Sequence, residues 1–258
     1  MHSPISYFGG KSRLAKKIVR LIPKHTTYVE PFCGAAWVLF QKDPSKVEVI
    51  NDLDKDLITF WRVIQNHLAA FLEYFRYAVV SRELFAIENR KDPTTLTDIQ
   101  RAVRFYYLQR LGYGGKTAGR TFGGGVVRPS SLNLTTIEDV LLEVHWRMQR
   151  VTIEHLDACV CIQRYDRPAS FFFIDPPYWH VSQDYVAKFS DKDFVRLRDT
   201  LLTVKGKFLL TLNNTSAVRS IFKAFHQIRV VTKYSTGNSN VSSTTRGADR
   251  SELFIHNM

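Results

Sequence analysis

Cysteine is scarce in this sequence. Three of the 258 residues are cysteines, Cys33, Cys159 and Cys161. One residue separates the last two, which fits neither a CxxC redox motif nor a zinc site, and an odd, sparse set does not make a disulfide framework. We therefore expect three reduced thiols in a cytoplasmic protein, with Cys159 and Cys161 on a strand or at its end, and no bound metal.

Signals for secretion and membrane insertion are missing as well. The opening residues, MHSPISYFGGKSRL, contain no apolar core of a signal peptide, so we expect none. No run approaches the roughly 20 apolar residues that span a bilayer, and we see no lipidation signal. Internal repeats and low-complexity tails are also absent. We therefore expect neither a secreted nor a membrane-bound protein.

Acidic residues are in deficit. The chain has 24 Asp and Glu against 36 Lys and Arg, which gives a formal charge of +12 at pH 7. Enzymes of small metabolites rarely carry such an excess, and a polyanionic partner such as nucleic acid is its usual physical reason. The 45% hydrophobic content is ordinary for a globular protein. A chain of 258 residues can bury one core and still carry a large insertion.

Strands alternate with helices at both ends of the chain, as judged from apolar periodicity. The expected strands are 28–32, 47–50, 151–156, 171–174, 208–212, 228–234 and 253–256, and the expected helices are 12–22, 35–41, 191–204 and 216–225. This alternation predicts an α/β fold, a mostly parallel sheet covered on both faces. Because no helix separates the last two strands, we expect an antiparallel pair at one edge.

The alternation disappears between residues 57 and 150. Helices are expected there over 57–79, 98–111 and 137–149, interrupted by the glycine-rich, basic segment RLGYGGKTAGRTFGGGVVRPSS, Arg110 to Ser131. An all-helical block inside an α/β chain indicates an inserted second domain. We therefore divide the chain into a domain of residues 1–56 and 151–258 and an insert of residues 57–150, with a hairpin or loop near 110–131.

The segment YFGGKS, Tyr7 to Ser12, ends like a phosphate loop. The Walker pattern requires another glycine where Ile5 stands, and a strand before it for which there is no room. A nucleotide-triphosphate site is therefore not expected. Two interpretations stay open, a flexible helix entry and a small anionic ligand held by Lys11 and backbone amides at a helix start.

Two acidic motifs follow predicted strands. VEPFCGAAW, Val29 to Trp37, is strand, acid, glycine turn and helix, the arrangement by which α/β sheets bind adenosine-containing cofactors at strand carboxyl ends. VINDLD places Asp52 about twenty residues further on, where an acid can accept both ribose hydroxyls. The alternative is that Asp52 or Asp54 only caps the next helix.

DPPY, Asp175 to Tyr178, ends the apolar run FFFI. An exocyclic base amine is a poor nucleophile, because its lone pair is delocalised into the ring. A carboxylate and a carbonyl that bind its two hydrogens localise that lone pair, and two prolines stiffen the backbone that carries the Pro176 carbonyl. Tyr178 can then stack on the base. The alternative is a turn with an acidic cap, and the role of Trp179 is open between pocket wall and packing.

The glycine-rich segment interleaves basic and aromatic side chains. This combination suits phosphate contacts and base stacking. The candidates are Arg110, Tyr113, Lys116, Arg120, Phe122 and Arg128. A solvated flexible loop is the alternative, and the net charge favours nucleic acid.

The motifs together resemble a known family. The order YFGGK, VEPFCGAA, VINDLDKDLI, helical insert and FFFIDPPY is similar to that of Dam-type DNA adenine-N6 methyltransferases, the alpha group of the D12 class. The resemblance spans essentially the whole chain. It implies a Rossmann-like sheet, S-adenosylmethionine as cofactor, and a helical insert that recognises double-stranded DNA. It also implies methyl transfer to adenine N6 after the base is flipped out.

The resemblance implies roles for individual residues. The catalytic set is Asp175, Pro176, Pro177 and Tyr178. The cofactor set is Tyr7, Gly10, Lys11, Glu30, Pro31, Phe32, Gly34, Asp52, Asp157 and Asp175, in which Asp157 corresponds to an acid near the cofactor adenine. The final strand follows a polar loop, residues 235–246. Two positions depart from the family pattern: Ala158 stands in place of phenylalanine, and Gly114 replaces an asparagine of GATC-methylating members, so GATC is not predicted.

We thus expect a monomeric, site-specific DNA adenine methyltransferase. Within the enzymes, the alternatives are methylation of cytosine N4, RNA adenine or a protein amide. Outside them, the alternative is a non-catalytic DNA-binding protein on a methyltransferase scaffold.

Overall fold

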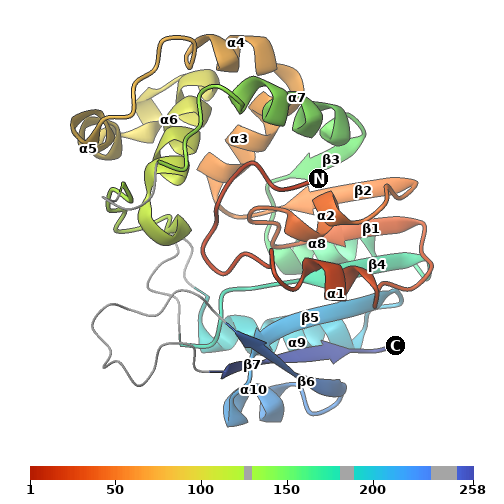
Figure 1. Ribbon diagram of the computed structural model, residues 1–258. Helices are drawn as coiled ribbons and strands as arrows, with labels where there is room; N and C mark the ends of the chain where they lie inside the picture. Colours follow the sequence, from red (N-terminus) through yellow and green to blue (C-terminus); the bar gives the residue numbers. More distant parts are fainter. Residues whose placement is uncertain (125–129, 181–188, 234–248) are drawn as a thin grey trace.

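One mixed sheet forms the centre of the molecule (Figure 1). The computed structural model describes residues 1–124, 130–180, 189–233 and 249–258. Within these ranges, seven strands pair in the order β3-β2-β1-β4-β5-β7-β6. Their bounds are β1 Thr27–Glu30, β2 Val47–Asn51, β3 Val151–Glu154, β4 Ser170–Ile174, β5 Lys207–Asn213, β6 His226–Lys233 and β7 Asp249–His256.

Strands β1 to β5 are parallel, and β7 runs antiparallel to both of its neighbours, β5 and β6. The predicted α/β sheet with an antiparallel edge is therefore confirmed. Position 234, the predicted end of β6, and the polar loop 235–246 lie outside the described residues.

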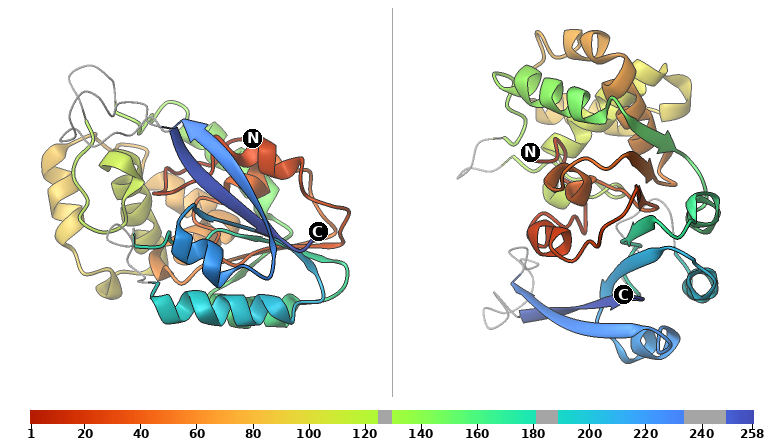
Figure 2. Two further views of the ribbon diagram at one scale, coloured as in Figure 1. Left: turned by 90° about the horizontal axis from the view of Figure 1, so that it is seen from below. Right: turned by 90° about the vertical axis from the view of Figure 1, so that its right-hand side faces the viewer.

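Helices cover both faces of the sheet (Figure 2). Phe171 and Phe173 of β4 belong to one hydrophobic cluster, and Phe172 and Ile174 belong to another. Because successive strand residues point to opposite faces, the run Phe171 to Ile174 must be apolar, and all five residues of β4, including Ser170, are buried. The first cluster includes α1 Ala15–Val19 and α2 Trp37–Gln41; the second includes α8 Ala158–Tyr165, α9 Asp191–Leu202 and α10 Ser216–Ile221.

A helical block stands beyond β3 at one end of the sheet (Figure 1). It consists of α3 Lys55–Asn66, α4 Leu68–Glu73, α5 Arg82–Arg90, α6 Asp98–Leu111 and α7 Ile137–Met148. Its apolar side chains, such as Trp61 and Phe105, join the same cluster as Ile50 of β2 and Phe171 of β4. The block therefore packs directly on the sheet. The division of the chain at residues 57 and 150 stays a prediction.

Several predicted elements differ from the structure: the helix expected over 12–22 is shorter, α1 Ala15–Val19, and the helix expected over 216–225 ends at Ile221. The helix expected over 57–79 is interrupted at His67, whose φ of −135° and ψ of 32° leave the helical region, and α4 ends at Glu73. The prediction that Cys159 and Cys161 lie on a strand or at its end is wrong, since both are in α8. The helix begins there because the Asp157 carboxylate accepts hydrogen bonds from two backbone N–H groups. All three thiols are buried and free.

Candidate active site

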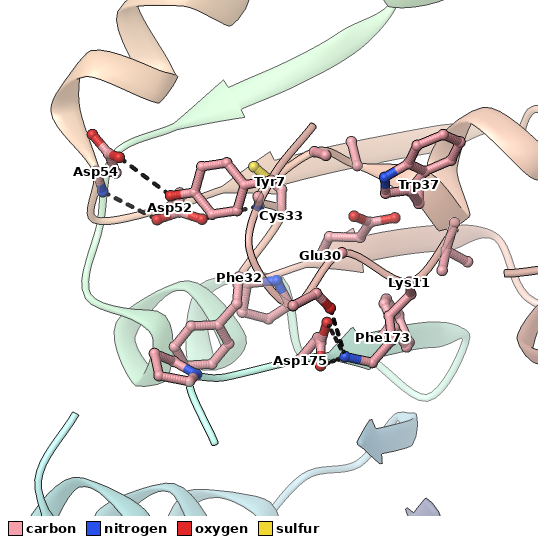
Figure 3. A pocket seen from close by; sticks show the side chains of 18 of the residues that line it. Tyr7, Lys11, Glu30, Phe32, Cys33, Trp37, Asp52, Asp54, Phe173 and Asp175 are labelled. Carbon is pink, nitrogen blue, oxygen red and sulfur yellow. Dashed lines mark hydrogen bonds and ion pairs between the residues drawn. The ribbon is translucent and has the colours of Figure 1, made fainter. Parts of the chain in front are cut away.

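A pocket opens at the carboxyl ends of β1, β2 and β4 (Figure 3). In the sheet, β2 and β3 lie on one side of β1, and β4 and β5 lie on its other side. The strand order therefore reverses between β1 and β4. Ligands of open α/β sheets bind at such a point. The lining residues come from 7–11, 30–38 and 52–54, with Ala158, Phe173, Asp175, Pro177 and Phe189.

Glycines allow the YFGGK segment to lie close to the turn after β1. A Cβ on Gly10 would lie 3.0 Å from the Tyr7 carbonyl oxygen and 3.1 Å from Nε1 of Trp37. Gly34 has a φ of +44°, and a Cβ there would lie 3.1 Å from Cδ1 of Tyr7. The Tyr7 hydroxyl donates to Oδ2 of Asp54 at 3.2 Å. Both predicted glycines are thus required by the close approach of Tyr7.

Lys11 connects the N-terminal segment with the DPPY motif. Its ammonium lies 2.8 Å from Oδ2 and 2.7 Å from Oδ1 of Asp175, and donates to the Gly9 carbonyl at 3.1 Å. It also lies 4.8 Å from the centre of the Tyr178 ring. Lys11 is buried and lies shortly before α1, where it holds Asp175. Its binding of a small anionic ligand or of the cofactor stays a prediction.

Asp175 has a second donor on β5. The Thr211 hydroxyl donates to Oδ1 at 2.7 Å, so the carboxylate is fixed between Thr211 and Lys11. Oδ2, which contacts Lys11 alone among these donors, has further acceptor capacity, because an ionised carboxyl offers about four lone-pair directions. The site therefore holds Asp175 in one orientation while it can still accept a hydrogen bond from a ligand.

Asp52 and Asp54 have different roles. Asp54 caps α3, because its side chain accepts from the N–H groups of Asp56 and Leu57. Asp52 accepts from the N–H of Gly34 and the N–H of Asp54, both at 3.0 Å, and it lines the pocket. Burial, with the nearby Asp54 charge adding to it, raises the pKa of Asp52 to about 6. The capping alternative thus applies to Asp54 and not to Asp52.

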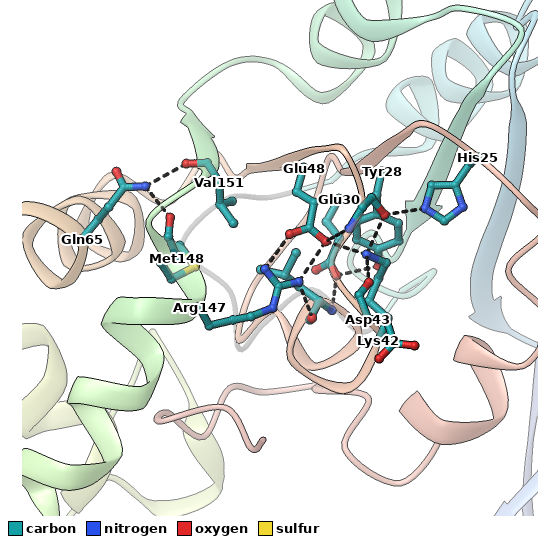
Figure 4. Close-up of polar contacts among 12 residues, drawn as sticks. His25, Tyr28, Glu30, Lys42, Asp43, Glu48, Gln65, Arg147, Met148 and Val151 are labelled. Atoms are coloured by element: carbon teal, nitrogen blue, oxygen red, sulfur yellow. Dashed lines mark hydrogen bonds and ion pairs between the residues drawn. The ribbon is translucent and has the colours of Figure 1, made fainter.

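Glu30 lines the pocket and belongs to a buried polar network behind it (Figure 4). Its Oε1 accepts from the Tyr28 hydroxyl at 2.7 Å and the Leu39 N–H at 2.8 Å, and burial raises its pKa to about 7. The ammonium of Lys42 lies 4.5 Å from the centre of the Tyr28 ring and 2.5 Å from Oε1 of Glu48. Because its oxygen is held by these donors, Glu30 shapes the pocket wall.

Arg147 extends this network to the helical block. From α7 it donates to both oxygens of Glu48 on β2, at 2.5 and 2.8 Å, and to the Leu39 carbonyl at 3.1 Å. We expect Arg147→Ala to lower the free energy of unfolding by about 1–3 kcal/mol, because Glu48 keeps Lys42 but loses its second cationic partner, and the Leu39 carbonyl loses a donor. Urea unfolding measures this change.

The matched control is Arg164→Ala. Arg164 is half exposed and reaches Glu154 through one contact of 3.3 Å. Its removal is expected to cost less than about 1 kcal/mol. Equal losses in the two variants would contradict the role assigned to Arg147.

The remaining predicted cofactor residues are placed as follows. Pro31 and Phe32 line the pocket. The Pro31 carbonyl accepts a hydrogen bond from the Asn51 side chain at 2.9 Å, and the Phe32 ring lies edge-on to the Phe189 ring at 5.6 Å.

Asp157 is not among the residues that line the pocket. Its carboxylate caps α8 and pairs with Arg196. The neighbouring Ala158 is the lining residue. An interaction of Asp157 with a cofactor stays a prediction.

Trp179 packs behind the DPPY motif. Its ring lies 4.9 Å from that of Phe194 on α9, and it is not among the pocket-lining residues. The side chain of Asn213 on β5 accepts from the Trp179 N–H at 3.0 Å and donates to the Trp179 carbonyl at 3.1 Å. Of the two roles left open by the sequence, the structure assigns Trp179 to packing.

The glycine-rich segment folds back on itself. Gly112 pairs with Phe122, and the Tyr113 N–H donates to the Thr121 carbonyl at 2.8 Å. Tyr113 is 56% exposed near this turn, whereas the Phe122 ring packs edge-on against Phe85 at 5.5 Å. Tyr113 is thus free to contact another molecule, and Phe122 anchors the segment to α5.

The basic side chains predicted to contact nucleic acid have different surroundings in the structure. Arg110 donates to the carbonyls of Pro4 and Ser131. Arg120 is turned inward: burial lowers its pKa, and the charge of Asp54 opposes that shift. Lys116 is half-buried, and Arg128 lies outside the described residues. Their contacts with nucleic acid stay predictions.

A hydrogen-bonded bridge joins the glycine-rich segment to YFGGK. The Phe8 N–H donates to the Gly115 carbonyl at 2.9 Å. The Gln109 amide donates to the carbonyls of Ser6 at 2.6 Å and Gly115 at 2.7 Å. The segment predicted to contact DNA is therefore fixed to the segment predicted to contact the cofactor.

Metal and membrane features are not found in the described part of the chain. There, no group of three or more His, Cys, Asp or Glu side chains is arranged to hold a metal ion. No helix in the same ranges is long and apolar enough to cross a membrane.

The strand order, with antiparallel β7 between β5 and β6, defines a Rossmann-like methyltransferase sheet. Comparison with known proteins narrows this class. Residues 7–236 match the family of D12 class N6 adenine-specific DNA methyltransferases, and the chain belongs to that family. The predicted family is thereby confirmed.

Individual relatives agree with this family. The type II methyltransferase M.CviBI of Paramecium bursaria Chlorella virus NC1A is 27% identical over 89% of this chain and 90% of its own. The retron Ec67 DNA adenine methylase of Escherichia coli is 25% identical over 93% and 87%. The DNA adenine methylase of Salmonella typhi is 35% identical over 43% of this chain and 41% of its own.

Sequence reasoning missed three side chains near DPPY: Thr211, Asn213 and Glu252. Thr211 and Asn213 alternate with apolar residues at the end of β5, in LLTLNN. Polar residues inside an otherwise buried strand were the available signal. Glu252 follows three polar residues of β7 and comes directly before its apolar run Leu253 to Ile255, so its sequence gives no comparable signal.

Proposed function

We propose that this chain transfers the methyl group of S-adenosylmethionine to N6 of a specific adenine in double-stranded DNA, after the base has been flipped out. The observation that carries the proposal is the fixed carboxylate of Asp175. It lies between Lys11 and Thr211 and lines a pocket that also contains Asp52. The family of the chain, adenine-specific DNA methyltransferases, supports the same reaction.

The residues of the pocket fit S-adenosylmethionine. Asp52 has its carboxylate fixed by two backbone N–H groups, with remaining lone pairs for two ribose hydroxyls. Phe32 offers an apolar ring, and Gly10 and Gly34 keep the backbone close to Tyr7. When bound, S-adenosylmethionine supplies an electrophilic methyl group on a positively charged sulfur.

Asp175 and the Pro176 carbonyl accept the two hydrogens of the adenine N6 amine. These acceptors localise the nitrogen lone pair and orient it for in-line attack. Asp175 need not remove a proton first, because the N6 proton becomes acidic once the nitrogen is alkylated. The ion pair with Lys11 keeps the carboxylate oriented while the base enters.

Extrusion of the base is supported by the aromatic residues. Unstacking costs roughly a few kcal/mol, and stacking on the Tyr178 ring recovers about 1–3 kcal/mol. Contacts of the exposed Tyr113 and of basic side chains with the duplex would supply the remainder. We propose the insert, residues 57–150, as the part that recognises the DNA sequence.

The cellular setting is part of the proposal. A type II methyltransferase among the relatives supports a restriction-modification role, and bacterial and viral DNA methylases among them support action on DNA in the cytoplasm. We propose that the chain acts as a monomer.

Labelled S-adenosylmethionine tests the substrate class. The protein is incubated separately with unmethylated duplex DNA and with RNA, and the nucleic acid is digested to nucleosides. Label in adenosine nucleosides of the duplex is expected. Label in cytosine, in RNA or in the protein itself would replace the proposal by one of the alternatives.

Cofactor affinity is expected to depend on pH through Asp52. Ribose hydroxyls donate better to the ionised carboxylate, and the pKa of this group without cofactor is about 6. Affinity should therefore be full above pH 6 and fall by about tenfold for each pH unit below it. Calorimetric titration measures this profile. Asp52→Asn should bind more weakly with a flatter profile, whereas an unchanged profile would contradict the assignment.

A further inference from the structure

Thr211 is a polar residue in the buried part of β5. Its side chain is 0% exposed, and it stands between two leucines in the strand sequence KFLLTLN. In the parallel register of β4 with β5, Ile174 lies beside Leu210. Asp175 and Thr211 are the next positions along the two strands, and the Thr211 hydroxyl lies 2.7 Å from Oδ1 of Asp175.

The Thr211 hydroxyl has one hydrogen to donate and lies near two acceptors. Oδ1 of Asp175 is at 2.7 Å, and the Ile174 carbonyl oxygen is at 3.5 Å. The first distance is ordinary for an O–H···O hydrogen bond, and the second is longer than such bonds are. An ionised acceptor also gives the stronger bond. The hydrogen is therefore donated to Asp175.

The two carboxylate oxygens of Asp175 differ in their contacts. Oδ1 contacts both the Thr211 hydroxyl and the Lys11 ammonium, each at 2.7 Å. Oδ2 contacts the Lys11 ammonium at 2.8 Å (Figure 3). An ionised carboxyl offers about four lone-pair directions, which is about two for each oxygen. Thr211 and Lys11 together thus occupy both directions of Oδ1 and one direction of Oδ2.

Thr211 stands behind the carboxylate and not in the pocket. Asp175 and Lys11 line the pocket, whereas Thr211 is not among its lining residues. The Asp175 side chain keeps 16% of its surface exposed. A ligand in the pocket therefore meets the carboxylate directly, and Thr211 acts on that ligand through Asp175.

We propose that Thr211 is a positioning residue that makes Oδ2 of Asp175 the oxygen that accepts a hydrogen of the adenine amine. The inference rests on the proposed function, in which Asp175 is one of the two acceptors at N6. Lys11 contacts both oxygens, and its rotatable donors can follow a carboxylate that turns. The hydroxyl on β5 is held by the strand, so it fixes the rotation of the carboxylate and keeps Oδ2 directed at the base.

Thr211→Val removes the hydroxyl and keeps the branched side chain. Steady-state kcat for methyl transfer to duplex DNA is expected to fall about tenfold, less than the roughly 10²-fold cost of a misplacement of about 1 Å, because Lys11 still holds the carboxylate. The KM for S-adenosylmethionine should stay within about twofold, since residue 211 does not line the pocket. Thr211→Ser keeps the donor and should stay within about threefold of wild-type kcat.

The Asp175→Asn background distinguishes a role in orientation from a general loss of packing. There the amide oxygen takes the place of Oδ1, between two donors, and the NH₂ group takes the place of Oδ2, facing the donor amine of the base. Because Thr211 favours this unproductive orientation, Thr211→Val should not slow Asp175→Asn further. A second tenfold loss in this background would overturn the inference, as would a Thr211→Ser variant as slow as Thr211→Val. If Thr211→Val does not fold, Thr211→Ala replaces it in both backgrounds.

A matched control is Thr200→Val. Thr200 on α9 is also buried, and its hydroxyl donates to the Arg196 carbonyl at 2.9 Å. This variant should unfold at a lower temperature with unchanged kcat. Absence of methyl transfer by the wild type would overturn the proposed function itself, whereas an active wild type with a fully active Thr211→Val would overturn this inference alone.

Discussion

Asp175→Asn is expected to lower kcat for methyl transfer by about 10²–10³-fold, the usual cost of removing one preorganised polar group from a reacting centre. Both carboxylate oxygens already face donors, Thr211 on one side and Lys11 on the other. An asparagine therefore places its NH₂ group against one of these donors, whichever way the amide turns. It also leaves the buried Lys11 ammonium without its counter-charge. Radiolabel transfer under saturating cofactor and DNA measures the loss.

The matched control for this substitution is Asp166→Asn. Asp166 accepts from the N–H groups of Lys205 and Gly206, in the loop before β5 and at the opposite edge of the sheet from the pocket. Its kcat should match the wild type. An Asp175→Asn variant that retains more than about a tenth of wild-type kcat would contradict the role of the carboxylate.

Gly115→Ala is expected to weaken cofactor binding, although residue 115 does not line the pocket. A Cβ at this position would lie 2.9 Å from the backbone nitrogen of Tyr7 and 3.0 Å from the carbonyl carbon of Ser6. Since backbone atoms cannot move aside as a flexible side chain does, the YFGGK segment must shift. Overpacking costs about 1–3 kcal/mol, which corresponds to roughly a 5- to 150-fold loss of affinity if this segment bears all of it.

Gly119→Ala is the control that distinguishes the steric clash expected at residue 115 from the backbone strain of alanine at a positive φ. Gly115 has a φ of +69° and Gly119 a φ of +59°, so alanine is strained at both, yet a Cβ on Gly119 meets nothing within 4 Å. Calorimetric titration with S-adenosylmethionine should show weaker binding by Gly115→Ala and near wild-type affinity for Gly119→Ala. Equal affinities would mean that the bridge between the two segments does not influence the cofactor site.

The positions of Asp52 and Asp175 could be predicted because each follows an apolar strand. Parallel strands bring their carboxyl ends to one edge, so two acids at strand ends must lie near each other. The apolar run at 171–174 is buried on both faces, as a central parallel strand requires. The fold class followed from the same alternation of strands and helices.

The partners of these acids could not be predicted. Lys11 is 164 residues from Asp175 along the chain, and nothing local indicates their contact. The pairing of Asn213 with Glu252 depends on the register of β5 with β7, which a one-residue slip would change. Such contacts are set by tertiary packing and not by the motifs themselves.

Local elements were misjudged where tertiary packing or a side-chain cap decides the backbone. The sequence Ala-Cys-Val-Cys-Ile reads as a strand, yet the Asp157 cap begins a helix there, and Cys161 and Ile162 pack on the sheet. In the glycine-rich segment, the residue types did not show which side chains face outward. Tyr113 is exposed, whereas Arg120 donates to the Lys116 carbonyl and its guanidinium lies 5.8 Å from the centre of the Phe105 ring.

The most direct test of the central claim is modified-base sequencing of DNA from cells that express the protein. Cells that lack other adenine methylases are compared after expression of the wild type and of Asp175→Ala. We predict N6-methyladenine at one short sequence in the wild-type sample and none in the variant sample. Absence of N6-methyladenine from the wild-type sample, or N4-methylcytosine in its place, would contradict the assignment of adenine N6 as the methyl acceptor.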